Sequence, residues 1–194
     1  MSARRRLVNA IFLGAVAVLG IATVVIVVVR RVDTAARREA TAREIQECRA
    51  EYLRDPTNRR PLEKIIEFAR GRYSFGKSYA LMTLGKMQLE DTEVLGALVE
   101  GLKSGDGFVR DSASQALSRM GAKARPAKHG LAEAIRRYPE ERTALFAVEA
   151  LEHIGDADPD IVESLRFAES TTGDSFAREE AGRALKEIGK KRGQ

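Results

Sequence analysis

The chain of 194 residues has no tryptophan, one cysteine and two histidines. Because Cys48 is the only cysteine, the sequence excludes an intramolecular disulfide and a thiolate metal cluster. His129 and His153 each lack a second histidine at helical spacing, and one histidine alone does not make a metal site. We therefore expect no metal and no cofactor.

Gly-rich nucleotide loops and cation-binding loops are also missing. The segment 104–107, "SGDG", has neither the Lys-Ser/Thr of a P-loop nor the ligand spacing of an EF-hand, so we expect an inter-helix turn. In "DADPD", Asp156, Asp158 and Asp160 alternate, but no glutamate follows at the EF-hand distance. We expect a loop and a helix cap there, with adventitious cation binding as the alternative. Without a catalytic constellation, the sequence predicts that the chain is not an enzyme.

The net charge of +5 is confined to the beginning of the chain. Residues 1–43 hold eight arginines against Asp33 and Glu39, which leaves 25 basic and 26 acidic residues from Glu44 onward, a net charge of −1. Binding to phosphate backbones needs a basic surface, so we expect no nucleic-acid partner.

One long uncharged run stands near the N-terminus. After the basic flank 1–6, residues 7–29 form an apolar segment that ends at Arg30 and Arg31. This length predicts a transmembrane helix and a single-pass location in a bacterial inner membrane, with the side of the remaining chain undecided. A signal peptide is the alternative, although its apolar region is normally shorter. Ala10 and Gly14 form a small-xxx-small pair, a weak indication of dimerisation.

The segment 30–56 is rich in Ala, Arg and Glu, which favour helix, and Asp55-Pro56 stops it. We expect a helical stalk whose apolar residues dock on the domain that follows, namely Ile45, Cys48, Tyr52 and Leu53. A coiled-coil seam and an intermolecular Cys48 disulfide are the alternatives.

A short phrase, Ala-Leu-x-x-Φ-Gly with Φ as Leu, Met or Ile, occurs four times. It ends at Gly85, Gly121, Gly155 and Gly189, which are 36, 34 and 34 residues apart. Its apolar positions share one stripe of an α-helix, and the glycine suits the left-handed position just after a helix end. We therefore expect four helices that each stop at this glycine.

An amphipathic helix precedes each of these helices. Pro61 and Pro159 suit the first turn of such a helix, and Asp91 and Asp158 suit its N-cap. No pattern of period two indicates a strand in this part of the chain. The sequence thus predicts four helical hairpins over residues 57–190, with units at about 57–88, 89–121, 122–155 and 156–190.

The segment "FVRDSASQALSRMG" (residues 108–121) resembles the HEAT repeat, in particular the short HEAT-like variety of phycobiliprotein lyases. The resemblance covers about residues 57–190 and implies an all-α fold, a right-handed α-solenoid. It also implies that Arg110 and Arg178 pair with an acidic group of the adjacent unit; the candidates are Asp111, Glu140, Glu141, Asp174 and Glu180. The predicted repeat-stacking residues are these two arginines, Ala116, Ala150, Ala184 and the glycines Gly85, Gly121, Gly155 and Gly189.

Some positions of the second helices lie off the buried stripe and predict a partner-binding row. We call this set the second-helix row: Tyr79, Met82, Gln115, Arg119, Glu149, Glu152, His153, Arg183 and Lys186. A solvated face is the alternative. Tyr73, Phe75, Phe108 and Phe176 lie near the hairpin bends and are candidate anchors for a partner, or else insert into the core.

These patterns together predict a membrane-anchored HEAT-repeat protein that acts as a non-catalytic interaction or scaffold module for an unknown protein partner. A chromophore lyase-like or chaperone-like role is the alternative, and a weak homodimer through the anchor or stalk stays open. A HEAT-like DNA-binding protein or glycosylase fits less well, because the repeat region is nearly neutral and lacks tryptophan.

Overall fold

The computed structural model describes residues 34–192, and in this range the chain is helical with no strand. Residues 34–54 are helical, and the boundary between two compact parts of the chain falls between Thr41 and Ala42. The second part, from residue 42 onward, holds the helices described below. The predicted all-α class is therefore confirmed.

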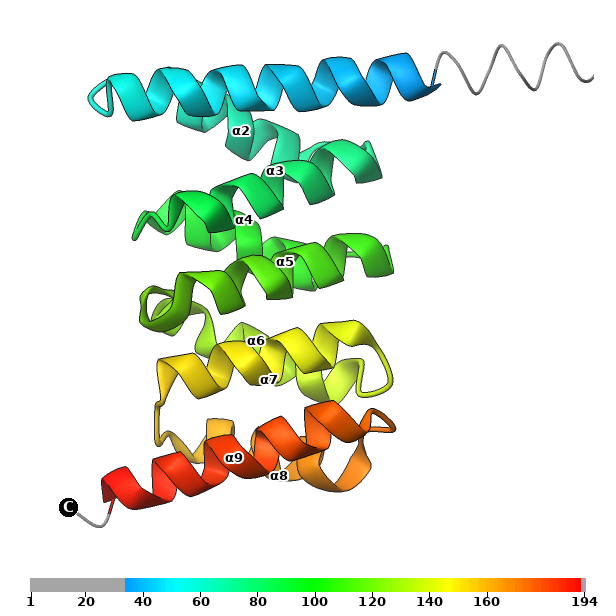
Figure 1. The fold of residues 1–194 in the computed structure, drawn as a ribbon, viewed down its shortest axis with the longest axis vertical. Coiled ribbons are helices and arrows are strands. Elements are labelled where there is room, and N and C mark those ends of the chain that lie inside the picture. Colours follow the sequence, from blue (N-terminus) through cyan, green and yellow to red (C-terminus); the bar gives the residue numbers. More distant parts are fainter. Residues whose placement is uncertain (1–33, 193–194) are drawn as a thin grey trace, which may run out of the picture. The chain divides into compact units, whose positions relative to one another are not determined.

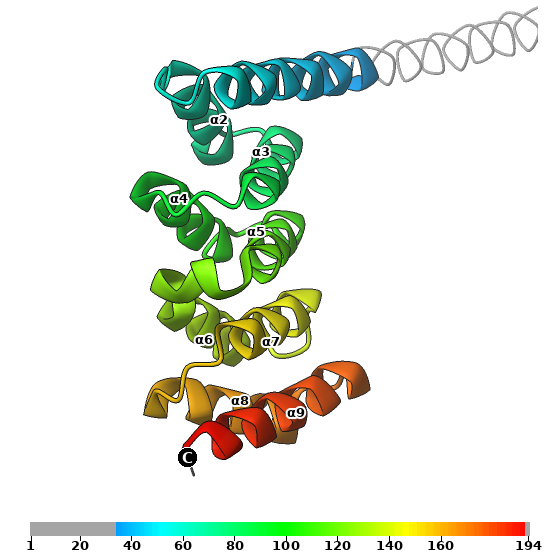
Figure 2. The ribbon, with the colours of Figure 1, turned by 60° about the vertical axis from the view of Figure 1, so that its left-hand side comes forward.

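The helices of the second part form successive hairpins, and each hairpin packs on the next (Figures 1 and 2). The pairs are α2 (Arg60–Arg70) with α3 (Ser74–Met87), α4 (Thr92–Leu102) with α5 (Gly107–Met120), α6 (Lys128–Arg137) with α7 (Arg142–Ile154), and α8 (Pro159–Thr171) with α9 (Ser175–Arg192). The first helices α2, α4, α6 and α8 make one layer and the second helices α3, α5, α7 and α9 make the other. This arrangement is consistent with an α-solenoid.

Several helix starts are fixed by the predicted capping residues. The carboxylate of Asp91 accepts the main-chain N–H groups of Glu93 and Val94, and that of Asp158 accepts the N–H of Asp160. Pro61 and Pro159 lie in the first turns of α2 and α8, where a missing N–H costs nothing. These predictions are confirmed.

The four repeated glycines do not share one role, which corrects the expectation that each ends a helix. Gly121 and Gly155 have positive φ angles of 58° and 60° and follow the last residues of α5 and α7. Gly85 lies inside α3, which ends two residues later at Met87, and Gly189 lies inside α9. An added Cβ at Gly85 would stand 2.5 Å from the Cβ of Ala116, so this glycine permits close approach of α3 and α5.

The core consists of the predicted apolar stripes of both layers. Alanines from α5, α7 and α9 are at most 1% exposed and let the second helices pack closely: Ala113, Ala116, Ala147, Ala150, Ala181 and Ala184. Leucine and isoleucine from the first helices fill the space between layers, and a fully buried leucine contributes about 1.5–3 kcal/mol. Such residues include Leu62, Ile65, Leu98, Leu131, Ile135, Ile161 and Leu165.

The helix before α2 also contributes to this core. Ile45 and Cys48 are buried as predicted and Tyr52 is half-buried, whereas Leu53 is 54% exposed, so the predicted docking of Leu53 is wrong. Burial raises the pKa of the Cys48 thiol.

The connection between α5 and α6 is longer than the other connections between hairpins. It forms a 3₁₀ helix, η1 (Gly121–Ala127), which contains Pro126. The loops before α4 and α8 are shorter and span residues 88–91 and 155–158. This difference shapes the surface beside α4.

The structure corrects the predicted single-pass membrane location. Within residues 34–192, no helix combines the length and the apolar character that a membrane crossing requires. A crossing helix needs about 20 mostly apolar residues, whereas the helices in this range carry charged side chains on their exposed faces. The apolar segment 7–29 and its Ala10/Gly14 pair lie outside the described residues.

Candidate interaction surface

The N-terminal ends of the second helices lie at one edge of the hairpin stack. Figure 1 shows α3, α5, α7 and α9 running in the same direction, with their N-terminal ends on the right. Three aromatic side chains at these ends are exposed: Tyr73 is 43%, Phe108 81% and Phe176 50% exposed. We call these three residues the aromatic edge.

Helix capping explains the exposure of the two phenylalanines. Asp106 accepts the main-chain N–H of Phe108 at 2.9 Å, and Asp174 accepts that of Phe176 at 2.8 Å. Each phenylalanine is the second residue of its helix and lies on the solvent side of the first turn. Phe75, the fourth predicted anchor, is half-buried instead.

Three aromatic rings of the first hairpin lie close to one another, and two of them, Phe75 and Tyr79, are stacked. The ring of Phe75 lies 5.8 Å from that of Tyr79 and 6.1 Å from that of Tyr73. The hydroxyl of Tyr79 accepts a hydrogen bond from Gln46 Nε2 at 3.1 Å. Tyr79 therefore joins α3 to the helix of residues 34–54.

The second-helix row is only partly open to solvent. Arg119, His153, Arg183 and Lys186 are exposed, whereas the remaining members are half-buried: Tyr79, Met82, Gln115, Glu149 and Glu152. Several members contact the adjacent second helix, which reduces the surface that they offer to a partner.

Ser118 on α5 joins two members of this row to the neighbouring helix. Its hydroxyl donates to Glu149 Oε2 at 3.3 Å, and its carbonyl oxygen lies 3.2 Å from Nδ1 of His153. The imidazole must carry its proton on Nδ1 to donate this bond. Glu149 and His153 thus hold α7 against α5.

A pair of carboxyl groups joins α7 to α9. Glu152 is hydrogen-bonded to Glu180, which is 4% exposed and accepts from Arg183 Nη2 at 2.6 Å. Burial, and then the hydrogen bond to Glu180 and its negative charge, raise the pKa of Glu152, while Arg183 and His153 oppose the shift. The hydrogen bond between the two carboxyl groups forms when Glu152 is protonated, which stabilises this junction.

Arg110 lies between two hairpins and is 7% exposed. Its guanidinium donates to both carboxylate oxygens of Glu141, with Nη2 2.6 Å from Oε1 and Nε 3.1 Å from Oε2. Nη1 donates to the Ser104 carbonyl at 2.7 Å, and the group lies 4.0 Å from the ring centroid of Tyr138. Glu141 belongs to the next hairpin, where it is the N-cap residue of α7.

The positions equivalent to Arg110 behave differently in the other hairpins. Ser74 stands at this position in the first hairpin, and its hydrogen bond lowers the pKa of Asp106, the N-cap residue of α5. Arg178 stands at this position in the last hairpin and is exposed. No later hairpin follows it within the described residues.

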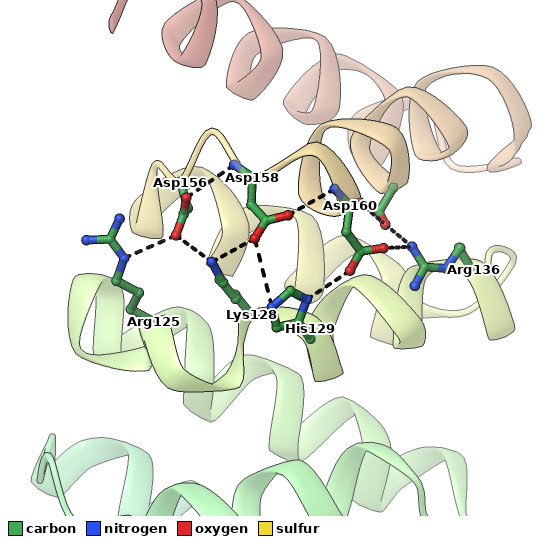
Figure 3. A network of polar contacts seen from close by, with 8 residues as sticks. Arg125, Lys128, His129, Arg136, Asp156, Asp158 and Asp160 are labelled. Carbon is green, nitrogen blue, oxygen red and sulfur yellow. Dashed lines mark hydrogen bonds and ion pairs between the residues drawn. The ribbon is translucent and has the colours of Figure 1, made fainter. Parts of the chain in front are cut away.

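The aspartates of "DADPD" form an ion-pair network with the preceding hairpin (Figure 3). Asp156 lies 3.1 Å from Arg125 Nε and 2.9 Å from Lys128 Nζ, and Asp158 lies 3.0 Å from the same ammonium group. Asp160 contacts His129 Nδ1 at 3.0 Å and Arg136 Nη1 at 2.8 Å. The same Arg136 nitrogen donates to Ser164.

These cations lower the pKa of all three aspartates. Lys128 is the first cause for Asp156 and Asp158, and the hydrogen bond from His129 is the first cause for Asp160. Carboxylates already neutralised by arginine and lysine are poor cation ligands. No group of three or more His, Cys, Asp or Glu side chains in residues 34–192 has the arrangement of a metal site.

Ion pairs between successive hairpins share a direction that the repeat pattern did not reveal. The cation lies in the earlier hairpin and the carboxylate in the later one. The pairs with this direction are Arg59–Asp91, Arg59–Glu93, Arg70–Glu100, Lys103–Glu133, Arg110–Glu141, Arg125–Asp156, Lys128–Asp156, Lys128–Asp158 and Arg136–Asp160. The sequence holds a signal for these pairs, namely a basic residue that is followed by an acidic residue about one repeat later.

No protein-family model and no curated protein matches this sequence.

Proposed function

We propose that this chain is a HEAT-like, right-handed α-solenoid of four helical hairpins that binds another protein and catalyses no reaction. The repeat phrase, the packing of each hairpin on the next and the arginine between the second and third hairpins support this assignment. The partner contacts the aromatic edge first, and the exposed part of the second-helix row second.

The 81% exposure of Phe108 is the observation that carries the proposal. A buried phenylalanine removes a large apolar area from water, and aromatic side chains are enriched among the residues that dominate binding energy. Phe108 has this area available because the first turn of α5 holds its side chain outward. Tyr73 lies at the same edge one hairpin before Phe108, and Phe176 lies there two hairpins after Phe108.

The stack provides a rigid support for these anchors. Parallel second helices in close contact place their N-terminal ends in a row, so a partner that spans several hairpins meets the anchors of the first, second and fourth hairpins along one edge. The glutamates and the histidine of the second-helix row are engaged in contacts between helices. We therefore assign the primary contact to the aromatic edge.

Site-specific photocrosslinking in the source organism tests this proposal. The photoreactive residue p-benzoylphenylalanine replaces Phe108 or Phe176 in the full chain, and an exposed residue of the other layer, Arg166, serves as the control position. We expect one and the same protein to be crosslinked from Phe108 and Phe176 and not from Arg166. Crosslinks from Arg166 alone, or from none of the three positions, would contradict the proposal.

A further inference from the structure

A groove of about 620 Å³ lies between α4 and η1. Leu95, Gly96 and Val99 of α4 form one wall, and Ala122 and Pro126 of η1 form the other. The volume falls within the range of about 300–1,000 Å³ found for binding sites. The groove follows the C-terminal end of α5, whereas the aromatic edge lies at the N-terminal ends of the second helices.

The groove is open because Gly96 has no side chain. An added Cβ at Gly96 would meet only Arg70 Nη2, at 3.8 Å. The packing glycines of the same hairpins differ, since an added Cβ at Gly85 or Gly101 would stand 2.5 or 2.8 Å from a side chain of α5. Gly96 is therefore not required for helix packing, and its effect on the surface is the space beside Leu95 and Val99.

The longer connection after α5 supplies the second wall. η1 replaces the short loop found before α4 and α8, and its 3₁₀ turns place Ala122 and Pro126 opposite α4. Both residues are exposed, while Leu95 is 8% exposed and Val99 is half-buried. The two walls together form a mainly apolar surface that is partly open to solvent.

Two cations of η1 line the groove, and they differ in their contacts. Arg125 donates to Asp156 of the last hairpin at 3.1 Å, so its charge is balanced on that side. Lys123 is exposed, and its ammonium group donates to the main-chain carbonyl of Gln88 at 3.1 Å, a neutral acceptor. Glu90 also lines the groove, so the lining carries the two positive charges of Lys123 and Arg125 against one carboxylate, and a ligand carboxylate pairs with Lys123.

We propose that this groove binds a short extended segment of a partner protein, with an aliphatic side chain placed between α4 and η1 and a carboxylate paired with Lys123. An extended chain fits because the groove is open along one side, whereas small-molecule sites enclose most of the ligand surface. Apolar pockets for side chains and one charged contact are the usual means by which extended peptides are recognised. The inference does not depend on the aromatic edge.

The test uses random heptapeptides displayed on phage and selected on the full chain. Selected peptides are synthesised, and their affinity is measured by fluorescence polarisation. We expect the selected sequences to share an aliphatic residue and an aspartate or glutamate. Gly96→Leu, which fills the groove, should weaken binding about tenfold or more, and Lys123→Glu should weaken it about fivefold.

Two variants complete the design. Gly189→Leu is the matched control, because Gly189, like Gly96, lies in a helix, and an added Cβ at Gly189 would meet no atom within 4 Å. This substitution should leave the affinity for the peptides unchanged. Ala122→Leu, an exposed substitution on the opposite wall, should weaken binding even if Gly96→Leu does not fold. Circular dichroism checks folding of each variant.

Three results would overturn the inference. The first is a selection that yields no peptide above background. The second is peptides that bind Gly96→Leu and Ala122→Leu as tightly as the wild type. The third is peptides whose affinity does not change with Lys123→Glu. Peptides that lose binding only with Phe108→Ala would also overturn it, while the proposed function would stand.

Discussion

The guanidinium of Arg110 and the carboxylate of Glu141 join two successive hairpins through a two-point salt bridge, with Nη2 2.6 Å from Oε1 and Nε 3.1 Å from Oε2. The Arg110 side chain is 8% exposed and that of Glu141 is 38% exposed. Because Glu141 is the N-cap residue of α7, this contact connects the first turn of α5 to the start of α7. It stabilises the packing of these two hairpins on each other.

Replacing Arg110 by methionine should destabilise the fold. The change removes both contacts to Glu141, the bond to Ser104 and the stacking on Tyr138. Breaking a buried ion pair costs about 3–5 kcal/mol, but the exposed part of Glu141 regains water, so we expect about 2–3 kcal/mol. Urea unfolding followed by circular dichroism measures the loss.

Arg178→Met is the matched control for this prediction. Arg178 occupies the equivalent position in the last hairpin and is exposed, so its replacement should change the free energy of unfolding by less than about 0.5 kcal/mol. Equal effects of the two substitutions would show that Arg110 does not stabilise the junction in the way described.

Gly85 and Gly189 occupy the same position of the repeat phrase and should respond in opposite ways to alanine. At Gly85 the added methyl group would collide with Ala116, and we expect a loss of about 1–3 kcal/mol despite the better helix propensity of alanine. At Gly189 the added group meets no atom within 4 Å, and we expect a gain of up to about 1 kcal/mol. Thermal unfolding of both variants measures these changes in stability. The same sign of change in both would contradict the assigned roles.

Asp156→Asn should weaken the junction between the last two hairpins. The substitution removes the charge that contacts Arg125 and Lys128, and we expect a loss of about 1–2 kcal/mol at pH 7. The matched control is Glu133→Gln, because the Glu133 carboxylate is 48% exposed and lies 3.7 Å from Lys103, so its loss should be within about 0.5 kcal/mol.

The effect of Asp156→Asn should also depend on pH. Lys128 lowers the folded-state pKa of Asp156 below the ordinary value of 3.8. The stability that this carboxylate provides is therefore present above pH 3.8 and is lost as the pH falls through the folded-state pKa. Wild type and variant should converge in acid, and a difference that stays constant down to pH 2 would contradict the network as the cause.

Glu152 has the opposite pH dependence. Its pKa is raised above the ordinary 4.5, so the stability that its protonated form provides is present below pH 4.5 and is lost as the pH rises through the folded-state pKa. Glu152→Gln imitates the protonated form and should stabilise the chain at pH 7 by about 0.5–1 kcal/mol, with no gain at pH 4. Thermal midpoints at the two pH values test this; destabilisation at pH 7 would contradict it.

The helices and the buried stripe could be predicted because apolar spacing and capping residues are local features. The roles of the glycines could not, since a glycine that ends a helix and one that permits close packing look alike in the repeat phrase. Glu141 was among the partners that the repeat resemblance implied for Arg110, whereas the other ion pairs between hairpins required knowledge of which side chains meet across about 30 residues. The sequence also left undecided whether Phe108 is exposed, because a position near a bend is compatible with either the core or solvent.

The affinity of the protein crosslinked at Phe108 for purified variants of the full chain tests the central proposal most directly. Isothermal titration calorimetry compares the wild type with Phe108→Ala/Phe176→Ala and with Arg166→Ala, an exposed position of the other layer. Two aromatic anchors of about 1.5–2 kcal/mol each predict an affinity loss of about 100-fold or more for the double variant and little change for Arg166→Ala. An unchanged affinity of the folded double variant would contradict the assignment of the aromatic edge as the binding surface.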